Sequence, residues 1–454
     1  MQSTAFLFLC YTWILKVGGI LQKYADYLDK KLYYMLLFTL TVTPFHQEFT
    51  SFCVAVCFFC ALFVAKVKGW AHAPVLSHKQ QTALYLFLLT IVISLPQSLN
   101  VMISCGNFLY VVVQYMALIF VALRYIWSPE EQARLDKPQA SAVKWQEKFW
   151  QLPRPLQLLA ALAVVALLES VIGIGQKFLG VMADNIWSDP DEFPELKIRV
   201  YATFVNPNIF GGYLVLVIGY CAAFFHLMKT HKLVRWGTLA LGLLSSLALL
   251  YTYSRGNWIA CAFMLLVFCI CYCHKAIIPV MGLGAAGLLI GGQAVIHRLS
   301  SITSGEDTSA ALRIAYLEST TAMIEEHPWG VGWYGYRFQY PDYNFYLDDK
   351  NVIMYHCHNI FLNIWSELGP QGIICFLIVW GLFLVMAWRL SRRGKTDWLR
   401  AVGCGYILAS VGIAVGGLTD HVYFNTKMGI FFWFLAILTA AAARYNEGIG
   451  KSSS

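Results

Sequence analysis

The chain has 454 residues, of which 58% are hydrophobic and only 13% charged, with a mean hydropathy of +0.58. Because a soluble globular domain carries roughly a quarter charged residues, this composition excludes a soluble enzyme and predicts an all-α polytopic membrane protein. The net charge of +8 matters less than its distribution, and we expect membrane lipid, and no nucleic acid, among the partners.

Twelve apolar segments are about long enough to cross a hydrocarbon core of roughly 30 Å. They lie at 32–45, 50–66, 82–96, 107–125, 155–176, 209–228, 236–252, 256–273, 276–293, 360–388, 401–417 and 427–443. The stretch 5–21 is interrupted by Lys16 and is expected to lie in the interface, although the sequence leaves open whether it spans. The chain therefore divides into a cytoplasmic or interfacial N-terminal segment 1–31, a transmembrane domain 32–443 and a cytoplasmic tail 444–454.

The basic residues are sorted by the alternation of the loops between these segments. By our count, 24 of the 33 lysines and arginines fall on one side and the remaining 9 on the other. The positive-inside rule then predicts a multi-pass protein of the cytoplasmic (inner) membrane with both termini in the cytoplasm. The long loop 294–357 faces outward, between the tenth and eleventh apolar segments when 5–21 is counted.

The outer stretch 197–208 contains more polar groups than a helix start requires. It carries Arg199 and the run Asn206-Pro207-Asn208. Proline fixes φ and asparagine caps helices, so one of these residues suffices to begin the next span. Asn206 and Asn208 therefore remain candidates for a supporting role in a site.

Arg255 lies in a very short outer turn between the spans 236–252 and 256–273. An arginine near the hydrocarbon costs roughly 2.5–3.5 kcal/mol unless its charge snorkels to the interface or is paired. Snorkelling and the binding of an anion both explain this position. The second outer arginine, Arg199, favours the anion.

The long outer loop is expected to begin with an amphipathic helix over 309–326, because apolar residues recur there at three- and four-residue spacing. Arg313 lies on its first turn, and a proline and a glycine at 328 and 330 end it. The aromatic-rich run 329–346 fits an aromatic belt at the membrane interface, or a groove in which sugar rings stack.

His358 and Asn359 open the span 360–388, and Glu367 lies about two and a half turns further on. A carboxylate inside the membrane should be paired or protonated. No acidic cluster has metal-ligand spacing, and His356 with His358 is a weak metal pair, so we expect neither a metal nor a cofactor. His327 and His421 are reserve candidates for a base.

Several of these motifs, taken in order, resemble the O-antigen ligase and polymerase superfamily. They are Arg199 with Thr-Phe-Val-Asn-Pro-Asn at 203–208, Thr-Tyr-Ser-Arg-Gly at 252–256, Arg313 with His-Pro-Trp-Gly-Val-Gly at 327–332, and His358-Asn359 with Glu-Leu-Gly at 367–369. The resemblance spans residues 199–372, and the first 150 residues add only compatible topology. The run 201–213 also resembles a subgroup labelled putative bicarbonate transporters.

The resemblance implies a membrane enzyme that moves a glycan from an undecaprenyl-pyrophosphate carrier to a glycan, lipid or protein acceptor outside the cytoplasmic membrane. It implies His358 as the catalytic residue. The same comparison implies donor-binding roles for Arg199, Arg255 and Arg313, and supporting roles for Asn206, Asn208, Asn359 and Glu367.

The chemistry of these side chains agrees with such a reaction. Arginine carries a permanent, planar charge that matches phosphate oxygens and stabilises a departing pyrophosphate. A histidine near its ordinary pKa is suited to take the proton of the attacking hydroxyl. We therefore expect a metal-independent, inverting transfer without a covalent enzyme intermediate.

Two other classes of protein compete with this interpretation. An anion transporter would use Glu367 and the outer basic residues, but the sequence contains no clear internal repeat and no matching pair of broken helices. A non-catalytic lipid-binding subunit would not need His358. The sequence leaves open the choice of ligase or polymerase, the glycan and its acceptor, the envelope type and the oligomeric state.

Overall fold

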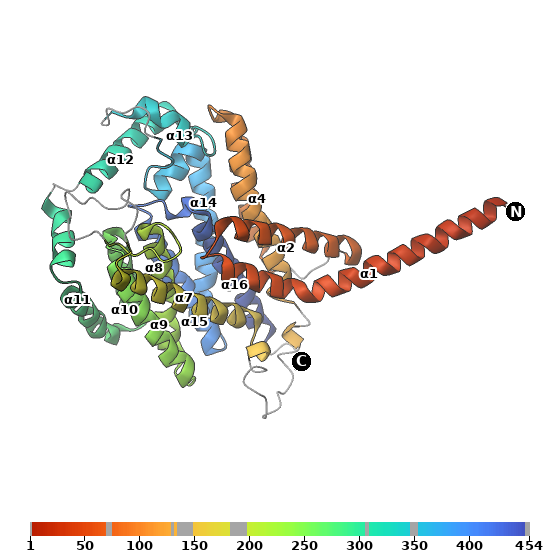
Figure 1. Cartoon of the computed structure of the whole chain (residues 1–454), viewed down its shortest axis with the longest axis horizontal. Helices are drawn as coiled ribbons and strands as arrows, with labels where there is room; N and C mark the ends of the chain where they lie inside the picture. Colours follow the sequence, from red (N-terminus) through yellow and green to blue (C-terminus); the bar gives the residue numbers. More distant parts are fainter. Residues whose placement is uncertain are drawn as a thin grey trace.

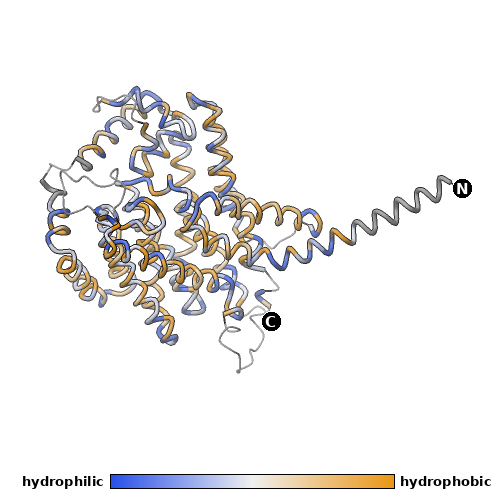
Figure 2. The backbone as a smooth tube through the Cα atoms, viewed as in Figure 1, coloured by the Kyte–Doolittle hydropathy of each residue, from blue (hydrophilic) through white to orange (hydrophobic). Residues whose placement is uncertain are grey.

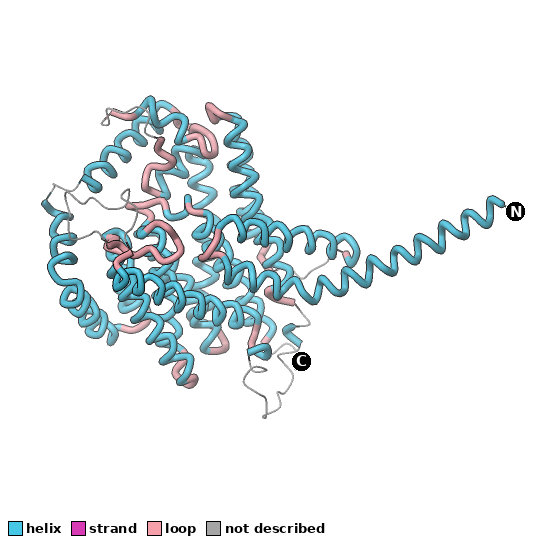
Figure 3. Tube along the Cα trace, viewed as in Figure 1, coloured by secondary structure: helices cyan, strands magenta, loops and turns pink. Residues whose placement is uncertain are grey.

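The computed structural model describes residues 2–69, 75–128, 131–133, 149–181, 198–304, 308–345 and 353–449, without the side chains of 2–17, 301–304, 308–310 and 423. Every regular element in these ranges is a helix (Figure 3), which confirms the all-α class. The main helices are α1 (Gln2–Val42), α2 (Gln47–Lys68), α3 (His78–Ser94), α4 (Val101–Tyr125), α7 (Arg154–Leu179), α8 (Pro207–Leu227), α9 (Lys232–Tyr251), α10 (Arg255–Cys271), α11 (Ile277–Ser304), α12 (Thr308–Glu326), α14 (Ile360–Arg393), α15 (Asp397–Gly416) and α16 (Thr426–Gly448).

Nine helices of the described chain are long and apolar enough to cross a membrane, and α10 is a shorter apolar helix. Helix α3, with 17 residues, and the C-terminal part of α1 occupy the two other predicted spans. The multi-pass class is therefore confirmed. The predicted number of twelve spans is not established by length and composition.

Helix α1 runs without interruption through the boundary expected near residue 31. It has 41 residues, and its N-terminal part projects away from the other helices (Figure 1). The segment expected in the interface and the expected first span thus belong to one continuous helix. The division into N-terminal segment, membrane domain and tail stays a prediction.

The core of the bundle is built on α8, α15 and α16. Helix α16 is buried along almost its whole length, and α15 packs against α8, α10 and α14. Small residues allow this close packing: a Cβ on Gly219 would lie 3.2 Å from the Ala409 backbone nitrogen. Outer helices expose large apolar side chains, among them Met102 and Leu289. Figure 2 shows hydrophobic residues along most helices, as contact with lipid requires.

Helix α14 is broken at Gly369, which has φ +70° and ψ −174° and precedes a proline. The break leaves carbonyl groups of the preceding turn without helical donors. The Ser366 carbonyl accepts a hydrogen bond from Val331 N at 2.8 Å, and the Glu367 carbonyl accepts one from Gly332 N at 2.9 Å. The segment after α12 therefore docks directly onto the broken helix.

Two glycines make this docking possible. Gly330 has φ +93°, and a Cβ there would lie 2.5 Å from the Glu367 carbonyl oxygen. A Cβ on Gly369 would lie 2.5 Å from the Trp329 carbonyl oxygen. Only glycine tolerates both the positive φ and the contact, so this part of the 327–332 motif has a structural explanation.

Candidate functional site

Five non-glycine residues of the described chain have a positive φ, and all of them lie in or beside the motif segments. They are Ala202 (+47°), Val205 (+66°), Tyr253 (+53°), Tyr334 (+59°) and His358 (+55°). Such backbone conformations cost about 1–3 kcal/mol each and gather at functional sites. The strained residues therefore mark these segments as a candidate functional region.

A cavity of about 50 Å³ is lined by four arginines from four different parts of the chain. Arg199 precedes α8, Arg255 begins α10, Arg298 lies in α11 and Arg313 lies in the first turns of α12. The lining also includes Asp420, from the loop between α15 and α16. The cavity has room for several waters or a small anion, and guanidinium groups match phosphate oxygens. We call it the arginine cavity.

Two neutral acceptors help to hold Arg199 in this cavity. Its Nε donates to the Thr252 carbonyl oxygen at 2.9 Å, and its Nη2 donates to Asn208 Oδ1 at 3.0 Å. Burial and the charges of the three other arginines lower the pKa of Arg199 to about 9, and the Asp420 carboxylate partly opposes this shift. Arg199 is therefore still charged at neutral pH, and a bound anion would relieve the repulsion.

The segment that carries Arg199 is fixed to the bundle through Thr203. Thr203 Oγ1 lies 2.7 Å from Glu169 Oε1 and 2.8 Å from the Pro44 carbonyl oxygen. Lys427 Nζ donates to the carbonyl oxygens of Thr203 and Pro44, at 3.1 and 2.6 Å. These contacts join the ends of α1 and α16 to α7, so the position of Arg199 depends on the packing of three helices.

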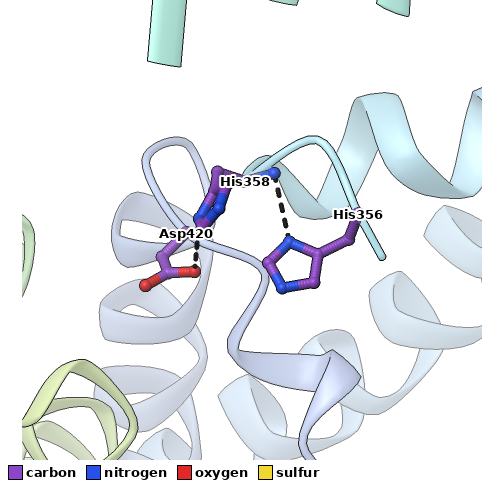
Figure 4. Close-up of side chains that lie close together, drawn as sticks. All are labelled: His356, His358 and Asp420. Atoms are coloured by element: carbon purple, nitrogen blue, oxygen red, sulfur yellow. Dashed lines mark hydrogen bonds and ion pairs between the residues drawn. The ribbon is translucent and has the colours of Figure 1, made fainter. Parts of the chain in front are cut away.

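His358 and Asp420 form a hydrogen-bonded pair (Figure 4). His358 Nδ1 lies 3.2 Å from Asp420 Oδ1, and the two side chains are 25% and 14% exposed. The His358 ring stacks on Tyr316, with ring centroids 5.5 Å apart. With the Nδ1 proton donated to Asp420, Nε2 of His358 has its lone pair available to accept a proton.

The protonation states around this pair follow from burial and charge. Burial opposes the ionisation of Asp420, but the hydrogen bond from His358 and the charge of Arg313 favour the carboxylate, and the pKa of Asp420 lies well below its ordinary value. Burial lowers the pKa of His356 well below 6.5 and that of His421 to about 3. At neutral pH the carboxylate is charged and these two histidines are neutral.

Asn359 and Asn206 act as helix N-caps. Asn359 Oδ1 accepts from two backbone N–H groups in the first turn of α14, at 3.0 and 3.1 Å. Its Nδ2 donates to the Leu418 carbonyl oxygen at 3.2 Å, which ties His358 to the loop that carries Asp420. Asn206 Oδ1 accepts from Asn208 N at 2.8 Å and starts α8. Both asparagines position their neighbours.

Glu367 lies apart from the His358–Asp420 pair. Its side chain is buried, and its Oε2 accepts a hydrogen bond from Tyr334 N at 3.0 Å. It faces a second, much larger cavity of about 1050 Å³, lined mainly by apolar side chains of α3, α4, α14 and α16. We call this cavity the apolar groove.

One end of the apolar groove lies beside the pair. The residues there are Tyr334, Tyr355, His356, His421 and Phe424, and we call this end the groove mouth. The rings of His356 and His358 have centroids 4.5 Å apart. The arginine cavity and the groove mouth therefore lie on either side of one short stretch of chain, which carries Asp420 and His421.

His356, His358 and Asp420 bring ligand-type atoms within 4.8 Å of one another, a spacing that can hold a metal ion. One ring nitrogen of each histidine already serves another contact. His358 Nδ1 faces Asp420, and His356 Nδ1 accepts a hydrogen bond from His358 N at 3.2 Å. The neighbouring arginine cavity also disfavours a further cation. The histidine–aspartate arrangement fits a proton-transfer pair better than a metal site.

Sequence reasoning missed Asp420 and Arg298 as members of the site. Asp420 is 62 residues from His358 along the chain. The sequence shows only that the short outer loop between the spans 401–417 and 427–443 carries a charged residue. Arg298 falls in the outward loop 294–357, where nothing in the sequence distinguishes it from other outer charges. Of the reserve bases, His421 lies at the groove mouth, whereas the His327 ring packs against Tyr343 with centroids 6.3 Å apart.

The fold and the site define a multi-pass helical membrane protein in which an arginine cavity adjoins a histidine–aspartate pair. Residues 240–377 match the family model described as O-antigen ligase. The match includes Arg255, Arg313 and His358, whereas Arg199 and Asp420 lie outside it. It confirms the resemblance to the O-antigen ligase and polymerase superfamily, and it indicates a membrane glycan enzyme of the O-antigen ligase type. No curated protein matches the chain.

Proposed function

We propose that the protein is a glycosyltransferase that moves a glycan from an undecaprenyl-pyrophosphate carrier to an acceptor hydroxyl on the outer side of the cytoplasmic membrane. One observation carries the proposal. Asp420 lines the arginine cavity and also hydrogen-bonds His358. A group that binds an anionic leaving group and a group that accepts a proton are therefore adjacent, as glycosyl transfer from a pyrophosphate requires.

The two cavities suit the two parts of a lipid-linked donor. The arginine cavity supplies up to four guanidinium groups for the pyrophosphate, and the burial of Arg199, Arg255 and Arg298 strengthens their interaction with its charge. The apolar groove has the volume and the apolar lining to hold a long hydrocarbon chain. Arg199, Arg255 and Arg313 are the donor-binding residues in this proposal, and Arg298 joins them.

In the reaction, the acceptor hydroxyl oxygen attacks the anomeric carbon and forms the new glycosidic bond. The bond from that carbon to the pyrophosphate oxygen breaks, and its electron pair leaves with the pyrophosphate. His358 Nε2 accepts the hydroxyl proton, while Asp420 orients the ring and stabilises the imidazolium that forms. Attack opposite the leaving group inverts the anomeric configuration. The arginines neutralise the charge of the leaving group, so the transfer is metal-independent in this proposal.

The test is glycan transfer by purified protein in liposomes, with a lipid-pyrophosphate-linked oligosaccharide, candidate acceptors and excess EDTA. We expect transfer in EDTA by the native protein. We expect His358→Ala to lower kcat by roughly 10²- to 10⁴-fold and Arg255→Ala to lower it by roughly 10²- to 10³-fold. The identity of the product distinguishes a ligase from a polymerase.

A matched control separates loss of the base from loss of any outer histidine. His327→Ala removes an imidazole that packs on Tyr343 outside the pair, and it should retain native activity. Equal activity in His358→Ala and native protein would remove His358 as the base. Anion flux into liposomes without any lipid-linked glycan, together with no transfer, would instead support the transporter class.

A further inference from the structure

Three aromatic side chains form a cluster at the groove mouth, each from a different segment of the chain. The rings of Tyr334 and Phe424 are nearly parallel, at an interplanar angle of 11° with centroids 6.2 Å apart. The Tyr355 ring lies 6.5 Å from Tyr334 and 5.9 Å from Phe424, between centroids. Arg337 lies over the Tyr355 ring at 4.7 Å and donates to the Tyr334 hydroxyl at 2.9 Å. These contacts order the cluster.

The cluster is accessible although it is ordered. Tyr355 is 40% exposed and Phe424 is 37% exposed, and all three rings line the apolar groove. Aromatic residues of a membrane-interface belt stand on the lipid-facing surface. These rings instead line a cavity beside His358.

The backbone at Tyr334, which belongs to this cluster, is held in a strained conformation. Tyr334 has φ +59°, and the buried Glu367 side chain accepts its N–H at 3.0 Å. The Trp333 N–H on the other side donates to Ser94 Oγ at 3.0 Å. A strained residue fixed by a buried carboxylate is a feature of sites that position a side chain for a ligand. Glu367 acquires a role as a positioning residue.

The imidazole of His421 indicates that the ligand carries a hydroxyl group. His421 is 8% exposed and lines the groove mouth, and its Nδ1 has no hydrogen-bond partner among the described residues. The His421 ring lies 6.1 Å from Phe424 and 5.5 Å from His356, between centroids. A buried polar atom without a partner costs free energy, which a ligand hydroxyl would recover. A neutral imidazole serves a hydroxyl as either donor or acceptor.

We infer that Tyr334, Tyr355, Phe424 and His421 form a pyranose-binding subsite, in which the apolar face of a sugar ring contacts the aromatic cluster and a hydroxyl bonds to the His421 imidazole. The chemistry combines an aromatic surface with a fixed polar group, as carbohydrate requires, since a pyranose has one apolar face and a rim of hydroxyls. The assignment of the sugar to a donor or an acceptor rests on the proposed function. The binding of a pyranose at this subsite does not depend on that function.

The first test measures binding without any transfer. Saturation-transfer NMR on the full-length protein in lipid nanodiscs uses a panel of methyl pyranosides as probes and sorbitol, an acyclic polyol, as control. Saturation of aromatic protons should reach the ring C–H protons of at least one pyranoside and not those of sorbitol. Phe424→Leu and Tyr355→Leu should weaken the signal by about fivefold. Phe345→Leu, which removes an exposed aromatic ring outside the cluster, should retain it.

Two outcomes would overturn the subsite: equal signals for sorbitol and every pyranoside, or a native signal in Phe424→Leu. Both results are independent of enzymatic activity, so failure of the proposed transfer would not produce them.

The second test uses the transfer assay to assign the sugar. In Phe424→Leu, an increase of about fivefold in KM for the lipid-linked donor alone assigns the subsite to the donor glycan, and the same increase for the acceptor alone assigns it to the acceptor. Unchanged KM values for both substrates would exclude a role for the subsite in transfer. Pyranoside binding without any transfer would leave the subsite standing and contradict the proposed function.

Discussion

Asp420 is the single residue that links the proposed anion-binding arginines to the proposed proton acceptor, His358. It faces four arginines on one side and His358 on the other. A carboxylate in an anion-binding cavity weakens anion binding, so its presence there needs a compensating benefit. Orientation of the His358 ring in the tautomer that accepts a proton on Nε2 is such a benefit.

Asp420→Asn should therefore separate binding from turnover. We expect kcat to fall by roughly 10²- to 10⁴-fold, because an amide no longer stabilises the imidazolium. Binding of the pyrophosphate carrier should stay equal or become tighter, because one negative charge leaves the arginine cavity. Single-turnover rates and equilibrium binding of the carrier check both expectations. Weaker carrier binding with an unchanged rate would place Asp420 outside the reaction.

His421 should make the fold sensitive to acid. Burial lowers the pKa of His421 from 6.5 to about 3, so the unfolded chain binds a proton below pH 6.5 that the folded chain refuses until about pH 3. Stability is unaffected above this window and falls inside it, by up to about 1.4 kcal/mol per pH unit. Thermal midpoints measured between about pH 7.5 and pH 5 should fall less steeply in His421→Gln. Phe345→Leu should keep the native slope, and an unchanged slope in His421→Gln would exclude this origin of the acid sensitivity.

The break in α14 organises the site at the scale of elements. It frees two carbonyl groups for the segment 329–332, and it brings Glu367 under Tyr334. The N-cap of the same helix, Asn359, links His358 to the loop carrying Asp420. One helix therefore holds both the pair and the groove mouth.

Glycine substitutions in and near the break should have different effects. Gly330→Ala and Gly369→Ala add a Cβ within 2.5 Å of a backbone carbonyl oxygen at a positive φ, and each should destabilise the protein by about 1–3 kcal/mol. Gly381→Ala lies in the same helix with no atom within 4 Å of the added Cβ, so it should be neutral or slightly stabilising. Thermal unfolding in detergent measures the difference. Equal midpoints for all three variants would contradict the structural role of the break.

The whole molecule presents its motif segments together, although they are far apart in the sequence. The arginine cavity draws on α10, α11, α12 and the segments before α8 and after α15. These segments can bind a lipid-linked substrate on the outer side of the membrane only if they face that side. The charge distribution predicts that orientation.

Cysteine labelling tests the orientation directly. Ile353 precedes the His358 segment and is 55% exposed, whereas Leu233 at the start of α9 is 72% exposed. In a background with the accessible native cysteines replaced by serine, Ile353→Cys should react with a membrane-impermeant maleimide on intact cells. Leu233→Cys should react only after permeabilisation. The reverse pattern would place the site in the cytoplasm and contradict the proposed donor.

Composition and local pattern by themselves determined the class of the protein. Long apolar segments can satisfy their backbone only as helices in lipid, so the membrane fold follows from hydropathy alone. The helix predicted over 309–326 is present as α12, although its apolar residues do not gather on one face. The order of short motifs sufficed for the resemblance to the O-antigen ligase superfamily, which the match over 240–377 confirms.

Only the tertiary structure decided which polar residues meet. Asp420 joins His358 across 62 residues, and Glu367 supports Tyr334 across 33. Arg298 enters the arginine cavity through the packing of α11. Hydropathy specifies that a helix crosses the membrane but carries no information on which helices become neighbours. That choice depends on small-residue contacts such as Gly219 on Ala409 and on the break at Gly369, whose effect exists only once the helices are packed.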